Sequence, residues 1–219
     1  MRRRPRQQTM MQRNRQIVLA ITGASGGLDA LRLLDCREAA GADVHVVASP
    51  HGRRLLAEEC DVRSITVEEL LGRSSSRVRV YAYGDVGSRL ASGSFLTEGM
   101  AICPCSSNTL GAVASGLGDN LVARAAQVTL KEGRRLVLVH REMPVSGVDL
   151  ENMLTLQRAG AIICPASPGF YLKPSTVADL VDFVTGRVLD LLNVPHDLRI
   201  RWDGRPAAER KAHDGSVEV

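Results

Sequence analysis

Six apolar runs that alternate with helical patterns constrain the fold of this chain more than any other feature. The runs lie at 16–21, 43–49, 77–83, 100–105, 135–140 and 161–166, and the helical patterns at 27–40, 51–60, 107–115, 120–132, 149–159 and 175–192. The runs are mostly continuous stretches of Val, Ile, Leu and Ala, which is typical of strands buried on both faces of a parallel sheet. We therefore expect an α/β fold: a three-layer, doubly wound, mainly parallel, Rossmann-like sheet.

Local signals agree with this pattern. Gly41 and Gly160 stand just after helical patterns and are candidate C-caps, because glycine adopts the left-handed conformation that ends many helices. Residues 66–69, Thr-Val-Glu-Glu, have the spacing of a capping box. Helix ends are thus predicted independently of the apolar runs.

Composition divides the 219 residues into three parts. Residues 1–15 carry six Arg and no acidic residue, which predicts a disordered basic leader; an arm that contacts RNA or a membrane is the alternative. Residues 16–195 hold the periodic pattern and predict one domain. Residues 196–219 are polar and aperiodic, which predicts a C-terminal extension with Trp202 as its only large apolar anchor.

The formal net charge of +4 does not indicate a nucleic-acid-binding domain. The excess of positive charge comes from the leader, since acidic residues slightly outnumber basic ones after residue 15, and only 3% of residues are aromatic. No apolar run approaches the roughly 20 residues that cross a bilayer or forms a secretory signal. We expect a cytoplasmic protein without a nucleic-acid or membrane partner.

Five cysteines, an odd number with no C-x-x-C spacing, argue against a disulfide scaffold and against a zinc site. Cys103 and Cys105 flank a proline at the end of the fourth run. We interpret them as small buried thiols, with metal binding or redox chemistry as the alternative. No metal is predicted.

A glycine-rich segment, "ITGASGG" at 21–27, follows the first run and precedes a helical pattern. Free N–H groups and the helix dipole make such a turn a seat for an anion. The segment lacks the Lys of an ATP-binding loop, since Leu28 and Asp29 follow, and it lacks the G-x-G-x-x-G of dinucleotide sites. A single phosphate, as in FMN, fits best; a pyridine-nucleotide enzyme and a turn without a ligand are the alternatives.

A second polar cluster, "SSNT" at 106–109, follows the fourth run. Helix capping needs only one such residue, so the other three are available for another role. Because open α/β sheets bind ligands at the carboxyl edge of the strands, these side chains are predicted to contact a phosphate, a ribityl chain or a flavin ring edge.

Several blocks of the sequence together match one family. They read "GASG", "ASGSFLTEGM", "CPCSSNTL", "NLVARAAQVTLKEGRRLVLVHREMP", "LENML", "PGFYLKP" and "GRVLDLL". On these blocks the chain resembles the flavin prenyltransferase (UbiX-type) family, including the relatives that accompany phenolic-acid decarboxylases. The resemblance covers nearly the whole chain apart from 1–15 and the last dozen or so residues, and it implies a flavoprotein fold.

The resemblance implies a metal-independent transferase. Such an enzyme joins a dimethylallyl group from dimethylallyl monophosphate to N5 and C6 of reduced FMN and releases phosphate. The product, prenylated FMN, is the cofactor of a separate decarboxylase in ubiquinone synthesis or aromatic-acid metabolism. The resemblance also implies a homo-oligomer, a dodecamer, whose active sites are shared between subunits.

The site residues carry over by motif. The resemblance assigns to FMN binding Gly23, Ala24, Ser25, Ser49, Ser106, Ser107, Asn108, Thr109 and Arg124. It assigns to catalysis Ser25, Glu59, Lys131 and Glu142. It assigns to the phosphate of the prenyl donor Lys131, Arg141, Tyr171 and Arg187.

Elementary chemistry supports these roles. Breaking an allylic C–O bond leaves a phosphate dianion and a delocalised carbocation, so fixed positive donors on the leaving group should catalyse it. Glu142 could accept the flavin C6 proton, with Ser25 as a relay. The alternatives are that Lys131 complements a helix dipole, that Glu142 forms an ion pair with an arginine, and that Glu59 is a surface acid.

Three residues depart from the family pattern: Asp29 in the glycine loop, His140 before the Arg-Glu pair, and Asp149 in the following helix. None of them replaces a proposed catalytic residue. Two other functions stay open at this point. One is an FMN-dependent cysteine decarboxylase, for which His51 is a candidate residue, and the other is a non-catalytic FMN carrier or accessory subunit.

Overall fold

The computed structural model describes residues 16–198, 200 and 201. Its centre is a six-stranded sheet in the order β3-β2-β1-β4-β5-β6, in which every neighbouring pair is parallel. The strands are β1 (Gln16–Ile21), β2 (Asp43–Ala48), β3 (Val78–Tyr81), β4 (Gly99–Cys105), β5 (Arg135–His140) and β6 (Ile162–Ile163). The predicted doubly wound parallel sheet is confirmed. The predicted leader and Trp202 lie outside the described residues.

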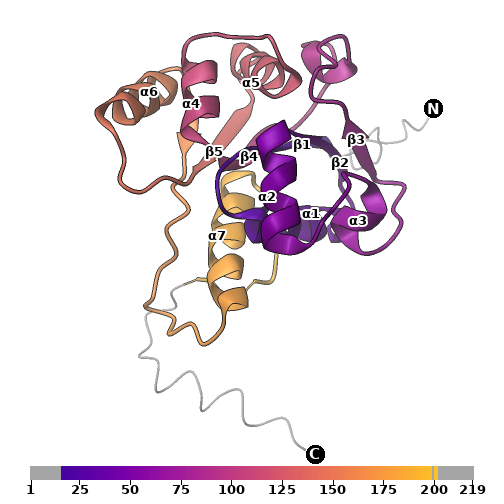
Figure 1. The fold of residues 1–219 in the computed structure, drawn as a ribbon, viewed down its shortest axis with the longest axis vertical. Coiled ribbons are helices and arrows are strands. Elements are labelled where there is room, and N and C mark those ends of the chain that lie inside the picture. Colours follow the sequence, from indigo (N-terminus) through magenta and orange to yellow (C-terminus); the bar gives the residue numbers. More distant parts are fainter. Residues whose placement is uncertain (1–15, 199, 202–219) are drawn as a thin grey trace, which may run out of the picture.

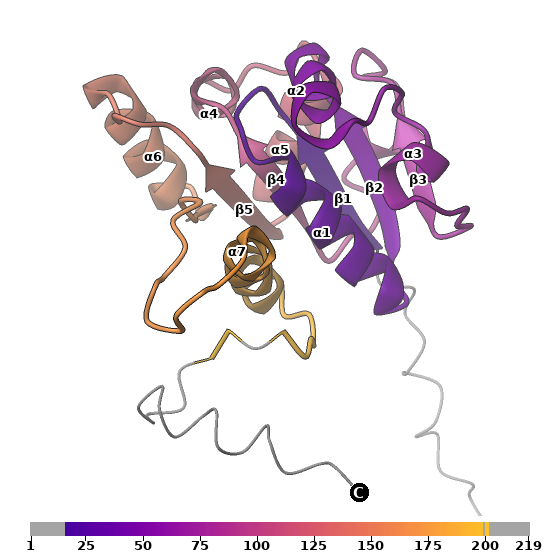
Figure 2. The same ribbon diagram turned by 60° about the horizontal axis from the view of Figure 1, so that its bottom comes forward.

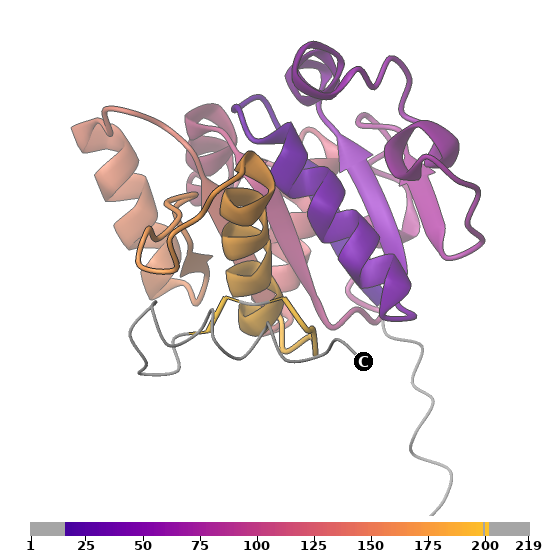
Figure 3. The ribbon, with the colours of Figure 1, turned by 90° about the horizontal axis from the view of Figure 1, so that it is seen from below.

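Helices cover both faces of the sheet, which gives the three layers. They are α1 (Gly27–Ala39), α2 (Pro50–Cys60), α3 (Val67–Leu71), the 3-10 helix η1 (Arg89–Ala91), α4 (Ser107–Ala114), α5 (Leu121–Lys131), α6 (Gly147–Arg158) and α7 (Val177–Leu191). Helices α1 and α7 lie side by side on one face, as Figure 3 shows, and Figure 2 shows α4 and α5 behind the sheet on the other.

Two apolar layers, one on each face, explain why the strands are continuous apolar runs. Successive side chains of a strand point to opposite faces. In β1, Leu19 and Ile21 belong to the layer beneath α1 and α7, whereas Val18 and Ala20 belong to the layer beneath α4 and α5. All four are at most 3% exposed. A polar residue on either face would therefore be buried.

The strand order reverses between β1 and β4. From β1 the chain winds outward through β2 to β3, then crosses to β4 and winds outward through β5 to β6. At such a reversal the loops after the two central strands separate and leave a crevice at the carboxyl edge, where open α/β sheets bind their ligands. The glycine loop follows β1, and the second polar cluster follows β4.

The predicted capping signals are mostly confirmed. Gly41 and Gly160 have φ angles of 77° and 97° at the ends of α1 and α6. The Thr66 hydroxyl accepts from the N–H of Glu69, but the Glu69 carboxylate accepts from the N–H of Arg63. Half of the predicted capping box is therefore formed, because the carboxylate binds an earlier turn instead.

The predicted C-terminal extension begins against α7. His196, whose side chain is 4% exposed, lies 3.2 Å from the Asp190 carboxylate through Nε2. Ile200 is 3% exposed and approaches Gly186. The described part of the extension therefore packs on the domain.

The cysteines are free thiols, and Cys103 and Cys105 are buried in β4 as predicted. Burial raises the pKa of Cys105 to about 12, so its thiol stays protonated. Within the described ranges no three His, Cys, Asp or Glu side chains gather as metal ligands. Across the same residues no helix combines the length and the apolar character of a membrane span.

Candidate active site

The loops at the carboxyl edge of the sheet carry most of the predicted site residues. Because β2, β1, β4 and β5 are neighbours and parallel, the segments that follow them meet at one edge (Figure 1). These segments hold Gly23, Ala24, Ser25, Ser49, Ser106, Ser107, Asn108, Thr109, Arg141 and Glu142. The topology thus brings together residues that are more than 100 positions apart in sequence.

Thr22, which sequence reasoning did not single out, ties the two central loops together. Its hydroxyl donates to the carbonyl of Pro104 at 2.9 Å and accepts from the N–H of Ser106 at 2.9 Å. It is 1% exposed. A hydroxyl directly after a buried apolar strand was the available signal, because such a group needs a partner inside the protein.

Glu59, at the end of α2, binds the glycine loop. Its carboxylate accepts from the N–H groups of Gly26 at 3.0 Å and Gly27 at 2.8 Å. Partial burial works to raise the pKa of Glu59, but these N–H groups, the Ser25 hydroxyl and the charge of Arg141 outweigh it and lower the pKa. An internal carboxylate thus occupies the amino end of α1, where an external anion could otherwise bind.

Asp29 lies beside Glu59 in the first turn of α1. Burial and, secondarily, the charge of Glu59 raise the pKa of Asp29 from 3.8 to about 6. The two carboxyl groups therefore differ in their affinity for a proton. Glu59 is ionised across the neutral range, whereas Asp29 titrates just below it.

The four polar residues after β4 divide into two kinds. Ser106 is the N-cap of α4: its hydroxyl accepts from the N–H of Thr109 at 3.3 Å and donates to the Thr109 hydroxyl at 3.1 Å. The Ser107 hydroxyl lies 3.1 Å from Nε2 of His140 at the end of β5. Asn108 is exposed. Ser106 caps the helix, as expected for one residue of the cluster. Ser107 contacts the end of β5, and Asn108 faces outward.

A hollow of about 860 Å³ opens beside this cluster, between α4 and α6. These helices lie side by side in Figures 1 and 2. Ser107, Asn108 and Glu142 all line it, as does Asp149. Its volume is within the roughly 300 to 1,000 Å³ of small-molecule sites. The carboxylate of Glu142 is exposed there and accepts from the N–H of Met143 at 3.1 Å.

Arg124 lies one turn into α5, close to this hollow. The amino end of α5 is fixed where the N–H of Leu121 donates to the carbonyl of Tyr83 at 2.8 Å. Tyr83 and Asn120, the N-cap of α5, both line the hollow. Arg124 is thus near the carboxyl edge.

Lys131 lies at the opposite edge of the sheet. It ends α5, and four residues later β5 begins at Arg135. Its ammonium forms an ion pair of 2.5 Å with Glu132 and is half exposed. The six residues of β5 separate this edge from Arg141 by about 20 Å, at roughly 3.3 Å per residue. One chain therefore does not bring Lys131 to Glu142.

The other two predicted donor-phosphate ligands lie on and beside α7. Arg187 pairs with Asp190 at 3.1 Å in the last turns of the helix and is 51% exposed. Tyr171 is 47% exposed, and its ring packs edge-on against Phe183 with centroids 5.7 Å apart. The predicted phosphate clamp is thus spread over three parts of the surface.

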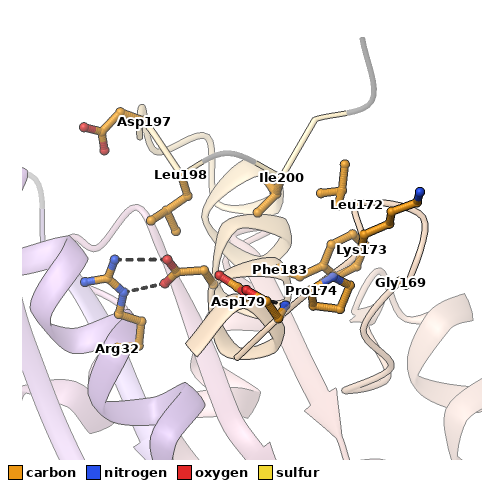
Figure 4. A pocket seen from close by; sticks show the side chains of 12 residues that line it. Arg32, Gly169, Leu172, Lys173, Pro174, Asp179, Phe183, Asp197, Leu198 and Ile200 are labelled. Carbon is orange, nitrogen blue, oxygen red and sulfur yellow. Dashed lines mark hydrogen bonds and ion pairs between the residues drawn. The ribbon is translucent and has the colours of Figure 1, made fainter. Parts of the chain in front are cut away.

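A second hollow, of about 530 Å³, lies between α1, α7 and the segment after residue 195 (Figure 4). Arg32 on α1 and Asp182 on α7 form one wall, with an ion pair of 2.6 Å. Lys173 and Phe183 lie on the other side. No residue assigned by the family resemblance lines this hollow.

Comparison with known proteins decides the family. A family model described as Flavoprotein matches residues 5–189. Flavin prenyltransferase UbiX of Pseudomonas aeruginosa is 46% identical over 195 residues, which cover 85% of this chain and 93% of that protein. The chain belongs to the flavin prenyltransferase family. As a member of it, the chain is a flavoprotein and a transferase.

Solved structures agree with the assignment. AnUbiX (PadA1), described in complex with FMN and dimethylallyl pyrophosphate, matches this flavin prenyltransferase with a TM-score of 0.80 and 39% identity, covering 88% of this chain and 100% of that one. A dodecameric FMN-dependent UbiX-like decarboxylase from Escherichia coli O157:H7 matches with a TM-score of 0.78 and 38% identity, covering 86% and 100%.

The polar groups at the carboxyl edge fit a flavin nucleotide. At the amino end of α4, Thr109 N–H and Leu110 N–H bind Ser106, whereas the described hydrogen bonds include no acceptor for the N–H groups of Ser107 and Asn108. The Thr109 hydroxyl accepts a hydrogen bond from the Ser106 hydroxyl, so its own proton is available to donate. A phosphate or a ribityl oxygen finds donors here.

Proposed function

We propose that this flavin prenyltransferase transfers a dimethylallyl group from its phosphate ester to N5 and C6 of reduced FMN. The single observation that carries the proposal is that Ser107, Asn108 and Glu142 line one hollow between α4 and α6, the helices that follow the neighbouring strands β4 and β5. When bound, reduced FMN supplies the nucleophilic nitrogen and carbon. The protein supplies orientation, proton transfer and charge stabilisation.

The flavin-holding residues are proposed to be those of the two central loops. Thr109 and the amino end of α4 donate to the nucleotide, and the loop from Gly23 to Ser25 lies next to them because Thr22 joins the loops. The Ser49 hydroxyl caps α2, where its oxygen accepts from the N–H of Gly52 at 3.0 Å. Its own proton is available to donate to the nucleotide.

Glu142 is proposed to hold the proton that leaves C6 of the flavin. It is the carboxylate that lines the hollow from the β5–α6 loop, and its exposure leaves an oxygen available to a bound molecule. The Ser25 hydroxyl, bound to the ionised Glu59, is the second proton-carrying group at this edge.

A second copy of the chain is proposed to complete the site. Lys131 and Arg187 lie away from the hollow, yet a leaving phosphate needs fixed cations. Assembly is supported by large apolar side chains left exposed on and before α6: Met143, Val148, Leu150 and Leu154 are 48 to 86% exposed. Such exposed apolar surface is typical of interfaces. The similar dodecamer supports the same conclusion.

The proposed product, prenylated FMN, would serve a separate decarboxylase. Asn108 and Glu142, which line the hollow, are both exposed, and this supports release of a modified flavin rather than its permanent retention. The donor is proposed to be the monophosphate. Because AnUbiX is described in complex with dimethylallyl pyrophosphate, the test includes both the monophosphate and the pyrophosphate ester.

An anaerobic assay tests the proposal. Reduced FMN is incubated with dimethylallyl monophosphate or pyrophosphate, and the flavin mass and the released phosphate are measured. We expect the flavin mass to rise by one five-carbon unit, with release of one phosphate per flavin, or of one pyrophosphate when the pyrophosphate ester is the donor. Glu142→Gln should lower the rate by about 10² to 10⁴, the usual contribution of a general acid or base. Flavin binding without any product would instead support the carrier function.

A further inference from the structure

Asp190, near the end of α7, binds three side chains through one carboxylate. Its Oδ2 accepts from Nη1 of Arg187 at 3.1 Å. Its Oδ1 accepts from Nη2 of Arg201 at 2.9 Å and lies 3.2 Å from Nε2 of His196. Arg187 is a predicted ligand of the donor phosphate, whereas His196 and Arg201 belong to the C-terminal extension. A single carboxylate thus joins the extension to a proposed site residue.

The hydrogen bonds of His196 show which ring nitrogen carries the proton. Nδ1 accepts from the N–H of Leu198 at 3.2 Å, so this nitrogen has no proton of its own. The ring proton is therefore on Nε2, which donates it to Oδ1 of Asp190. Because the side chain of His196 is only 4% exposed, Oδ1 is held from inside the protein.

Packing keeps the extension in the same place. Gly186 directly precedes Arg187, and a Cβ on Gly186 would stand 2.5 Å from Cδ1 of Ile200 and 3.2 Å from Cε1 of His196. Both residues of the extension therefore lie directly on this turn of α7, and Ile200 is 3% exposed. Buried contacts thus support the hydrogen bonds that hold Oδ1.

The position of Arg187 depends on this carboxylate. An exposed ion pair within one helix usually orders a long side chain only weakly. Here the carboxylate cannot turn freely, because two donors hold Oδ1, and Oδ2 is left to face Arg187. The described hydrogen bonds use only Nη1 of Arg187, which is 51% exposed, so its other N–H groups are available to an anion.

We propose that Asp190 is a positioning residue that holds the guanidinium of Arg187 for the phosphate of the prenyl donor. A guanidinium binds phosphate through two parallel N–H···O bonds, which need a fixed orientation of its plane. The cluster still attracts an anion, because Arg187 and Arg201 carry two positive charges and Asp190 carries one negative charge. This inference rests on the proposed function, in which Arg187 serves the leaving phosphate.

The substitution Asp190→Asn separates positioning from simple charge by the sign of its effect. If Asp190 were only a counter-charge, the substitution would strengthen phosphate binding, because a negative charge near the anion is removed. If Asp190 positions Arg187, the substitution weakens binding. The amide oxygen then accepts from His196 and Arg201, and the amide NH2 group faces Arg187, so that two donors oppose each other.

Donor affinity is measured on the full chain loaded with oxidised FMN, whose N5 is not nucleophilic, so that no transfer competes. Calorimetry gives the dissociation constant of dimethylallyl monophosphate for the wild type and each variant. We expect Asp190→Asn to bind the donor about tenfold more weakly, which corresponds to about 1.4 kcal/mol. Asp190→Glu, which keeps the charge and both acceptors, should stay within about threefold of the wild type.

Asp182→Asn is the matched control. Asp182 lies on the same helix, forms an ion pair of 2.6 Å with Arg32, and is 34% exposed, against 23% for Asp190. Its substitution should leave the donor affinity within about twofold of the wild type. Flavin affinity and thermal melting should not distinguish Asp190→Asn from this control. If Asp190→Asn does not fold, Asp190→Ala replaces it, with the same expected loss of donor affinity.

A double variant tests whether Asp190 acts through Arg187. If it does, Asp190→Asn causes no further loss of donor affinity in the Arg187→Ala background, because the side chain that it positions is already gone. A further tenfold loss in the double variant would overturn the inference. Unchanged or tighter donor binding in the single variant Asp190→Asn would overturn it as well.

The same measurements distinguish failure of the inference from failure of the proposed function. If Arg187→Ala binds the donor as tightly as the wild type, Arg187 is not a phosphate ligand, and the proposed donor site fails together with the inference. If Arg187→Ala weakens donor binding and Asp190→Asn does not, only the inference fails.

Discussion

The two edges of the sheet present their predicted site residues in opposite ways. At the carboxyl edge, Ser25, Glu59 and Ser106 are held by hydrogen bonds to loops and helix ends of the same chain. At the other edge, Lys131 forms an ion pair with its neighbour Glu132 and is half exposed. One edge is preorganised within the chain. The other presents a half-exposed cation, which we propose serves a second copy.

Lys131→Ala should have a large effect on activity and almost none on the fold. Loss of a fixed cation on a leaving phosphate costs about 10² to 10³ in rate. Exposed ion pairs contribute at most about 1 kcal/mol to folding, so the unfolding free energy should barely change. The anaerobic rate and a urea titration measure both effects.

Glu132→Gln is the matched control for Lys131→Ala. It removes the same ion pair and keeps the cation, so the rate should stay within about twofold of the wild type. Equal losses in both variants would show that the pair is structural. The contrast between the two edges would then fail.

Asp29→Asn should stabilise the carboxyl edge at neutral pH. The folded pKa of about 6 lies above the ordinary 3.8, so the folded state holds this proton more tightly. As the pH rises from 3.8 to 6 the unfolded chain ionises first and stability falls; above 6 the loss is complete. Removing the group should restore about 2 to 3 kcal/mol at pH 7 and nothing below pH 3.8.

Urea unfolding at pH 4, 5.5 and 7 checks the prediction for Asp29. The difference between the variant and the wild type should grow through this range. A constant difference would mean that the pKa of Asp29 is the same in the folded and the unfolded chain, and that its burial beside Glu59 has no consequence for stability.

Glu59→Gln should have a smaller effect. The amide can still accept from Gly26 and Gly27, but the bonds lose their charge assistance, which costs about 1 kcal/mol of unfolding free energy. Glu58→Gln is the control, because Glu58 forms an exposed pair with Arg54 and should change stability by less than about 0.5 kcal/mol. If chemical denaturation gave equal changes in unfolding free energy for both variants, the hydrogen bonds of Glu59 to the glycine loop would not stabilise the fold.

Most of the fold could be predicted from the sequence because strand burial leaves a direct pattern. Runs such as 16–21 and 135–140 became strands of the same bounds, since both faces of the sheet are covered. The run at 161–166 became the two-residue β6 at the edge, where pairing on one side limits its length. Full capping boxes at Ser146 and Thr176 were not predicted, since Asp rather than Glu completes them.

The site was predictable only where sequence position fixes spatial position. Residues that directly follow a strand, such as Ser106 and Glu142, must lie at the carboxyl edge. The binding of Glu59 to the glycine loop could not be derived in this way, because it depends on the length and angle of α2. Nor does spacing show that Lys131 ends its helix at the opposite edge from Glu142.

Complementation between two inactive variants tests most directly whether one site uses two chains. Glu142→Gln and Lys131→Ala are dissociated, mixed in equal amounts and reassembled, and the anaerobic rate is measured. Shared sites predict that about one quarter of the wild-type rate returns, since random pairing rebuilds that share of intact sites. A mixture as inactive as its two components would contradict the account.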